Sequence, residues 1–327
     1  MANLSCKYMG LDLKSPIIVG SCGLTNSLEK IQKMADYGAG AVVLKSIFEE
    51  QITNEIKQNI GNVDFNTDYA EALDYISGYT QMASFETYTQ LINKCKQSVD
   101  IPIIASINCT SDGDWISYAK RLEEAGVDAL ELNIFFLPAD FNLSGAANEE
   151  RYYKIINHIR EATRLPIAVK TSYYFSGLAN FLQKLSYLDI QSLVLFNRFY
   201  APDIDIDKLS IAASSALVEN DGFYNSLRWI AILYKHVNCS LSATSGISGA
   251  EEAIKQILAG ADTVQVVTAL YNNGLDYLKT IHKKLEKWMD KHQFANIDDF
   301  KGKLGFVNQN SDAFLRIQFM KHFAGIE

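Results

Sequence analysis

Four short apolar runs in this sequence each end in a polar side chain that could do chemistry. Runs of β-branched and small residues predict strands buried on both faces. A lysine at the end of such a strand is costly unless it meets water or an anion, and as a point cation it can stabilise developing negative charge. The pattern predicts a site at one rim of a parallel barrel. The polar residues and the runs before them are Lys45 after 41–44, Asn133 after 129–132, Lys170 after 167–169 and Asn197 after 193–196.

Each of these residues also has an ordinary structural explanation. Lys45 and Lys170 can extend from a rim into solvent, and Asn133 and Asn197 can cap exposed strand ends. Because a polar residue recurs at the same end of four runs, a shared site is a better explanation than four unrelated structural roles.

A second chemical signal is the group of small residues after two later apolar runs. The segment 244–249, Thr-Ser-Gly-Ile-Ser-Gly, precedes a helical pattern, and Thr268 follows the run 263–267. Small residues let backbone N–H groups approach a phosphate, and loops after strands seven and eight are the recurrent phosphate site of βα barrels. An ordinary glycine turn with a helix cap is the alternative. Gly20-Ser21, after 16–19, is a weaker signal of the same kind.

Eight strand-like runs alternate with helical patterns and would position these groups. They span 16–19, 41–45, 102–107, 129–133, 167–170, 193–197, 240–244 and 263–267. This alternation predicts an α/β fold, a closed (β/α)8 TIM barrel formed as a single domain over residues 1–327. An open doubly wound sheet is the alternative, but the GxGxxG turn that often opens that fold is absent from this sequence.

The chain is longer than the ~250 residues of a typical barrel. We assign the excess to a rim insertion after strand two, at residues 47–85, which we interpret as a lid, and to a second excursion at 199–222. A C-terminal tail at 296–327 also lies outside the barrel pattern.

Composition excludes several classes of function. A formal net charge of −8 argues against a general nucleic-acid binder. Five cysteines without a CxxC pair argue against a disulfide framework or structural zinc, and the histidines show no metal-ligand spacing. No apolar run reaches the ~18 residues of a membrane span, and no hydrophobic signal segment is present. We expect a cytoplasmic protein without a metal, acting on a small molecule rather than on nucleic acid or a membrane.

The order and spacing of these motifs resemble the dihydroorotate dehydrogenase family, in particular its class 1-related, dihydroorotate dehydrogenase-like branch. The resemblance covers residues 5–305 and implies an FMN-dependent oxidoreductase acting on CH–CH bonds, linked to pyrimidine biosynthesis, that takes hydride from a small anionic or heterocyclic substrate. It also allows a homodimer. The matching segments include 43–46, 131–134, 168–170, 195–200, 245–247 and 265–270.

The resemblance also implies roles for individual residues. Lys170 would face the N1/O2 edge of the flavin and stabilise its anionic reduced form, with Lys45 as a second catalytic lysine. Substrate contacts would come from Asn133, Asn197 and Arg198, although Arg198 could instead form a salt bridge with Asp203 or Asp205. The cofactor contacts would be Gly20, Ser21, Lys45, Ser46, Asn133, Lys170, Ser245, Gly246 and Thr268.

The sequence departs from the family pattern where the catalytic base is expected. The family reads Asn-hydrophobic-Ser-Cys-Pro-Asn, whereas residues 133–138 read Asn-Ile-Phe-Phe-Leu-Pro, which puts Phe136 at the base position. Phenylalanine cannot accept a proton, and the Met-Gly-Leu-Pro-Asn type loop expected after strand two is not recognisable. Both departures predict that dihydroorotate is a poor substrate. Replacement bases could be Cys109 or Ser172, with Tyr173 and Cys22 as further candidates, although ordinary packing explains each of them more simply.

Two other functions remain open at this point. A strand-end lysine in a barrel can form a Schiff base, as in an aldolase-type lyase. The phenylalanine at the base position also allows a non-catalytic flavin-binding descendant.

Overall fold

The computed structural model describes residues 2–48, 85–108, 112–197, 202–213, 222–306 and 312–315. Eight parallel strands form a closed barrel, because the pairing of the strand at 41–43 with that at 103–108 joins the two ends of the sheet. This arrangement confirms the predicted (β/α)8 barrel and all eight predicted strands. In chain order the strands are β3 (Ile17–Val19), β4 (Ala41–Val43), β6 (Ile103–Asn108), β7 (Ala129–Asn133), β8 (Ile167–Thr171), β9 (Ser192–Leu195), β12 (Ser240–Ala243) and β13 (Thr263–Val266).

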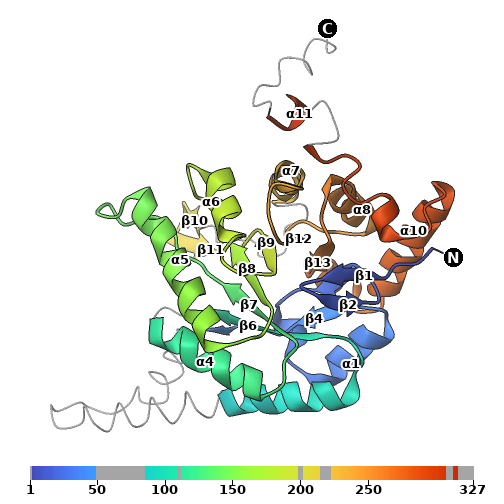
Figure 1. The fold of residues 1–327 in the computed structure, drawn as a ribbon, viewed down its shortest axis with the longest axis horizontal. Helices are drawn as coiled ribbons and strands as arrows, with labels where there is room; N and C mark the ends of the chain where they lie inside the picture. The colour runs from blue at the N-terminus through green and yellow to red at the C-terminus, as the bar shows by residue number, and fades with distance from the viewer. Residues whose placement is uncertain are drawn as a thin grey trace.

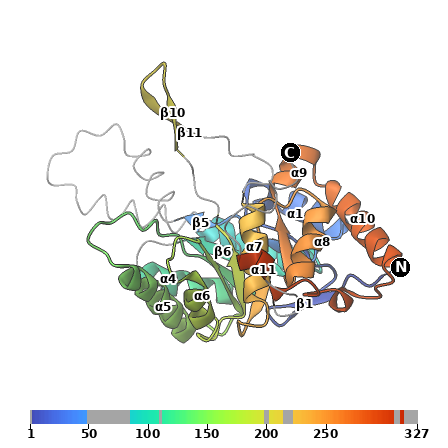
Figure 2. The same ribbon diagram turned by 90° about the horizontal axis from the view of Figure 1, so that it is seen from above.

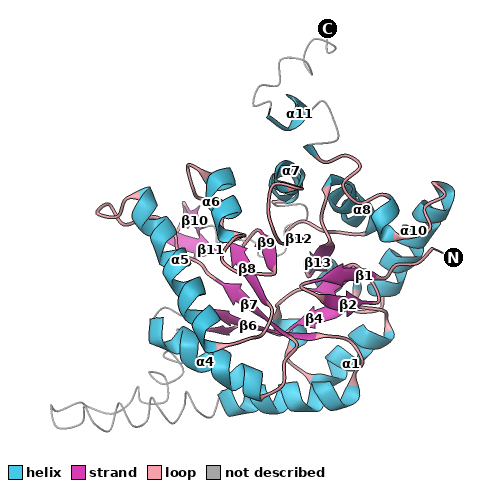
Figure 3. Ribbon diagram, in the orientation of Figure 1, coloured by secondary structure: helices cyan, strands magenta, loops and turns pink. Residues whose placement is uncertain are grey.

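Helices surround the strands on the outside of the barrel (Figures 1 and 3). Their apolar stripes face inward, as in the last long helix, where Leu278, Ile281, Leu285 and Met289 are buried at helical spacing. The short helix at 268–273 was not predicted. The helices are α1 (Leu28–Asp36), residues 85–98, α4 (Asp112–Glu124), α5 (Gly145–Ala162), α6 (Leu178–Leu185), α7 (Phe223–Leu233), α8 (Ala250–Ala259), α9 (Thr268–Asn273) and α10 (Tyr277–Lys291).

The strand residues divide between two apolar cores. Alternate residues, such as Leu130 and Val169, pack outward against the helices, while Ala129 and Ala168 belong to a smaller core inside the barrel. Tyr8 joins this inner core from an N-terminal hairpin of β1 (Cys6–Tyr8) and β2 (Leu11–Leu13). The sequence did not predict the hairpin, because three-residue strands leave almost no periodic pattern.

The two predicted excursions differ in how much of them the structure describes. After strand two, β5 (Ile47–Phe48) pairs with β6, and residues 49–84 lie outside the described part of the chain. The second excursion contains an antiparallel hairpin of β10 (Pro202–Asp205) and β11 (Ser210–Ala213). This hairpin projects from the barrel on the side opposite β1 (Figure 2).

The C-terminal segment returns to the N-terminal strand of the chain. Asn3 forms a parallel bridge with Asn296, the 3-10 helix η3 (Ile297–Asp299) follows, and Phe300 is buried. The short helix α11 (Asp312–Leu315) lies farther along the tail. Among the helices that the structure describes, none has the length and apolarity needed to span a membrane. The same residues contain no cluster of three or more His, Cys, Asp or Glu placed to hold a metal ion.

Side-chain acceptors join neighbouring strands where the strands begin. In each case the acceptor is the side chain of the residue just before a strand. The donor is the backbone N–H of the first or second residue of the barrel strand that precedes it in the chain. A nearby cation contacts each acceptor, which fixes its orientation. The three acceptors are Asp128 with Ile103 N and Lys96, Gln191 with Ile167 N and Arg160, and Asp262 with Leu241 N and Lys301.

A half-buried histidine connects α10 to the start of the first barrel strand. His282 Nε2 lies 2.7 Å from Ser15 Oγ. Its ring packs on Gly38, where φ is +94° and an added Cβ would lie 3.2 Å from His282 Cε1. Burial lowers the pKa of His282, so the imidazole stays neutral in the fold at pH values where an exposed histidine is already charged.

We predict that this histidine makes the protein sensitive to mild acid. The unfolded chain binds the proton near pH 6.5, while the folded chain binds it only at lower pH. Stability is therefore complete above about pH 6.5 and falls below it, by up to about 1.4 kcal/mol per pH unit. His282→Gln should reduce this loss. Urea unfolding at pH 7.5 and pH 5 measures it, and an equal acid loss in both proteins would contradict the prediction.

Candidate active site

The ends of all eight barrel strands meet at one rim because the strands are parallel. Asn133 and Lys170 are direct partners in the register of β7 and β8. Both share the inward side of their strands with Ala129 and Ala168, which line the inner core. The structure thus brings two of the predicted site residues side by side at the mouth of the barrel.

A carboxylate lies next to Lys170 inside the barrel. Lys170 Nζ is 3.8 Å from Glu131 Oε1, and the two side chains are 14% and 1% exposed. The other oxygen, Glu131 Oε2, accepts a 2.6 Å hydrogen bond from Gln265 Nε2 of β13. Sequence reasoning missed Glu131 and Gln265. The available signal was a polar residue inside each of two apolar runs, and Glu131 also has the same parity as the predicted rim residue Asn133.

Three buried oxygen atoms near this mouth accept no hydrogen bond from the described residues. They are Asn133 Oδ1, Glu131 Oε1 and Gln265 Oε1. A buried acceptor without a donor costs about 1–3 kcal/mol. Acceptors gathered beside a cation suit a bound molecule that carries both hydrogen-bond donors and negative charge.

A chain of hydroxyl groups joins the ends of β3, β4 and β6. Ser21 Oγ lies 3.1 Å from Ser46 Oγ and accepts a 2.9 Å hydrogen bond from Ser46 N. Ser46 Oγ lies 2.6 Å from Ser106 Oγ, and Ser106 N donates to Tyr88 OH. Ser46 is therefore held firmly, whereas its neighbour Lys45 is exposed.

The predicted phosphate loops present free backbone donors. Ser245 and Gly246 have φ values of 73° and 69°, two successive left-handed residues. Within the described residues, their N–H groups and that of Thr268, the first residue of α9, donate no hydrogen bond to the protein. Such a group of N–H donors suits an anion. The Ser245 hydroxyl is already used, since it donates to Phe196 O at 3.2 Å.

Two further predicted residues have structural partners at the rim. Asn197 Nδ2 donates to Ile134 O at 3.4 Å and to Lys170 O at 3.3 Å, so it ties β7 and β8 to the end of β9. Gly20 lies against the end of β13, where an added Cβ would come within 2.9 Å of Val267 Cγ2. Arg198 lies outside the described residues.

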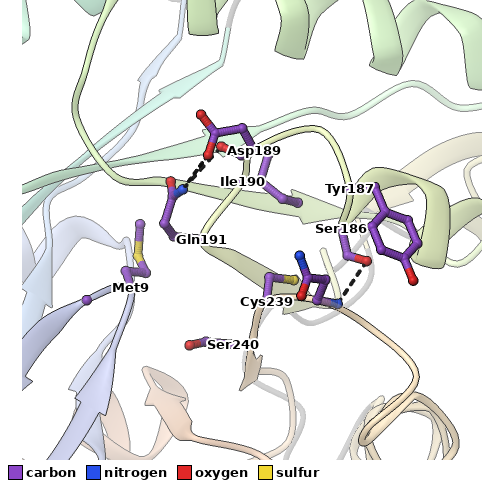
Figure 4. A pocket seen from close by; sticks show the side chains of 10 residues that line it. Met9, Ser186, Tyr187, Asp189, Ile190, Gln191, Cys239 and Ser240 are labelled. Carbon is purple, nitrogen blue, oxygen red and sulfur yellow. Dashed lines mark hydrogen bonds between the residues drawn. The ribbon is translucent and has the colours of Figure 1, made fainter.

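A cavity of about 400 Å³ lies at the other end of the barrel. It is lined by the hairpin turn Met9-Gly10 and by residues at the starts of β9 and β12, including Gln191 and Ser240 (Figure 4). Strand starts and strand ends are on opposite faces of a parallel barrel. This cavity is therefore separate from the mouth that holds Lys170.

Comparison with known proteins agrees with the arrangement at the mouth. Residues 3–289 match the family model described as Dihydroorotate dehydrogenase. The chain belongs to the dihydroorotate dehydrogenase family.

Members of the dihydroorotate dehydrogenase family align with nearly the whole chain. A protein of Thermoplasma volcanium named dihydroorotate dehydrogenase B (NAD(+)), catalytic subunit, is 27% identical over 92% of this chain and 98% of its own. A protein of Lactobacillus delbrueckii subsp. bulgaricus named dihydroorotate dehydrogenase A (fumarate) is 24% identical over 94% of this chain and 100% of its own.

Phe136, which the resemblance places at the family's base position, is half-buried against a helix. The Phe136 ring lies under the Arg151 guanidinium, 3.6 Å from its Cζ, and meets Tyr152 edge to face at 5.7 Å. Both partners belong to α5. Phe136 thus has a structural role in this dihydroorotate dehydrogenase family member, and its side chain offers no proton acceptor.

The replacement bases proposed from sequence have different surroundings. Ser172 is fully buried, and its Oγ accepts a hydrogen bond from Tyr174 N at 3.4 Å. Tyr173 is 39% exposed. Burial raises the pKa of Cys22, which disfavours its thiolate. Cys109 lies outside the described residues.

We predict that replacing one asparagine at this rim leaves the stability unchanged, whereas replacing the other lowers it. Asn133→Leu removes a buried acceptor that has no donor, so the protein without ligand should lose no stability. Asn197→Leu removes two hydrogen bonds and should cost about 1–2 kcal/mol. Urea unfolding of both variants without ligand measures the contrast, and an equal loss in the two would show that Asn133 is structural.

Proposed function

We propose that this protein is an FMN-dependent oxidoreductase that removes a hydride from a small anionic or heterocyclic substrate. The observation that carries the proposal is the mouth of the barrel, where Lys170 and the partnerless Asn133 Oδ1 lie side by side. Family membership over residues 3–289 supports the same reaction class.

The described residues fit a flavin mononucleotide in two respects. The free N–H groups of Ser245, Gly246 and Thr268 suit one terminal phosphate. The Lys170 ammonium suits the edge of the ring system on which negative charge accumulates. Bound FMN would supply the hydride acceptor. The residues that would hold it are Gly20, Ser21, Lys45, Ser46, Asn133, Lys170, Ser245, Gly246 and Thr268.

Substrate would lie over the same mouth, between the residues after β7 and β9. Asn133 and Asn197 supply amide groups there, and Arg198 is a candidate partner for a substrate carboxylate. Half-exposed aromatic side chains after β7 and β8, including Phe135 and Tyr173, offer apolar contact to a flat ring.

We predict that the purified protein binds FMN more tightly than FAD or NAD, because one terminal phosphate satisfies the free N–H donors. Titration followed by flavin fluorescence measures the FMN and FAD affinities, and displacement of bound FMN by added NAD measures the third. Asn133→Leu should weaken FMN binding without destabilising the protein. An absence of FMN binding at high micromolar concentration would refute the proposed function.

We predict that dihydroorotate reduces the bound flavin slowly or not at all. Oxidation of its C5–C6 bond needs a base to take the C5 proton, and general-base catalysis contributes ~10²–10⁴-fold. Stopped-flow absorbance of the FMN-loaded protein measures the rate. Reduction at an ordinary enzymatic rate, on the order of 1–10³ per second, would contradict this prediction, and Cys109→Ala and Ser172→Ala would then show which residue replaces the base.

The two alternative functions give different results in the same experiments. Borohydride trapping of a carbonyl compound on Lys170, without FMN binding, would indicate an aldolase-type lyase. Full FMN occupancy without reduction by any tested substrate would indicate a flavin-binding protein without this activity.

A further inference from the structure

Glu131 is a fully buried acid inside the barrel to which the proposed chemistry gives no task. It is 1% exposed. The sheet order places β8, β9 and β12 between β7 and β13, so the hydrogen bond from Gln265 to Glu131 crosses the barrel between opposite strands. This bond fixes the carboxylate inside the barrel, two residues before the rim residue Asn133.

Glu131 and Lys170 face each other as an ion pair without a hydrogen bond. The distance of 3.8 Å between Lys170 Nζ and Glu131 Oε1 is short enough for electrostatic attraction but too long for a hydrogen bond. Lys170 Nζ therefore keeps its three N–H donors for another acceptor. Gln265 holds the other carboxylate oxygen, which prevents Glu131 from moving onto the lysine.

Two tyrosines near Glu131 remain neutral at neutral pH. Burial, together with the Glu131 charge, raises the pKa values of Tyr8 and Tyr88. Among the described residues, Lys170 is the cation paired with Glu131. A buried ion pair is weak evidence for stability, because desolvation offsets the attraction. Its presence at the mouth therefore suggests a functional role.

We propose that Glu131 is a positioning residue that holds the Lys170 ammonium in place and partly offsets its charge, thereby setting the redox balance of a bound flavin. This inference rests on the proposed FMN function. A cation beside the flavin favours the anionic reduced form over the oxidised form. The carboxylate behind that cation weakens the preference, so the Glu131–Lys170 pair keeps the reduction potential below the value that Lys170 alone would give.

The test is the two-electron midpoint potential of FMN bound to Glu131→Gln, measured by equilibration with a reference dye. Glutamine keeps the shape of the side chain and an oxygen for Gln265, but removes the charge. We expect the preference for reduced over oxidised FMN to increase about tenfold, which is about 30 mV for a two-electron couple. Glu251→Gln is the matched control, since it removes the carboxylate of an exposed pair with Lys255 on α8.

Two further variants separate positioning from a direct effect of charge. In a Lys170→Met background, Glu131→Gln should raise the potential by much less than in the wild type, because the residue that Glu131 positions is gone and only the direct effect of the carboxylate charge on the flavin remains. Gln265→Leu should lower the potential, because the released carboxylate can move onto Lys170. This variant also tests the idea if Glu131→Gln does not fold.

The inference is overturned if the wild-type protein binds FMN and Glu131→Gln leaves the midpoint potential of the bound FMN unchanged. An equal rise in the Lys170→Met background overturns it as well, since Glu131 would then act directly on the flavin. A wild-type protein that does not bind FMN is a different failure, because it removes the proposed function before any variant is compared.

Discussion

The hydrogen-bonded pairing of β4 with β6 closes the sheet, and the position of the site depends on that closure. In a closed parallel barrel every second side chain of each strand points into one small interior. Residues far apart in the sequence therefore meet there, as Glu131 and Gln265 do across 134 positions. An open sheet would leave Lys170 on one face, with no opposite strand to supply Gln265.

The two ends of the barrel carry different kinds of polar group. Where strands begin, Asp128, Gln191 and Asp262 each accept a backbone N–H and contact a cation, so their hydrogen bonds are complete. Where strands end, Asn133 and Gln265 retain buried acceptors for which the described part of the chain supplies no donor. The first arrangement stabilises the fold, whereas the second lowers stability and is the one expected of a binding site.

The barrel could be predicted from sequence because each strand is a short β-branched run between helical patterns. The rim residues Lys170 and Asn133 could be predicted for the same reason, since they end such runs. Glu131 and Gln265 could not be predicted. A polar residue inside an apolar run can be assigned to the site only when it is known which side of the strand faces inward and which strand lies opposite. The β1–β2 hairpin escaped prediction because its strands have three residues each.

Two separate sets of elements build the mouth of the barrel. The lysine, the amide beside it and the free N–H donors come from β7, β8 and the ends of β12 and β13. Phe136 instead belongs to the loop after β7, where it contacts Arg151 and Tyr152 of α5. That packing uses the loop to hold a helix, so it can change without disturbing the strand ends. Under the proposed function, cofactor binding would depend on the strand ends and proton removal on the loop, so a change in one would leave the other intact.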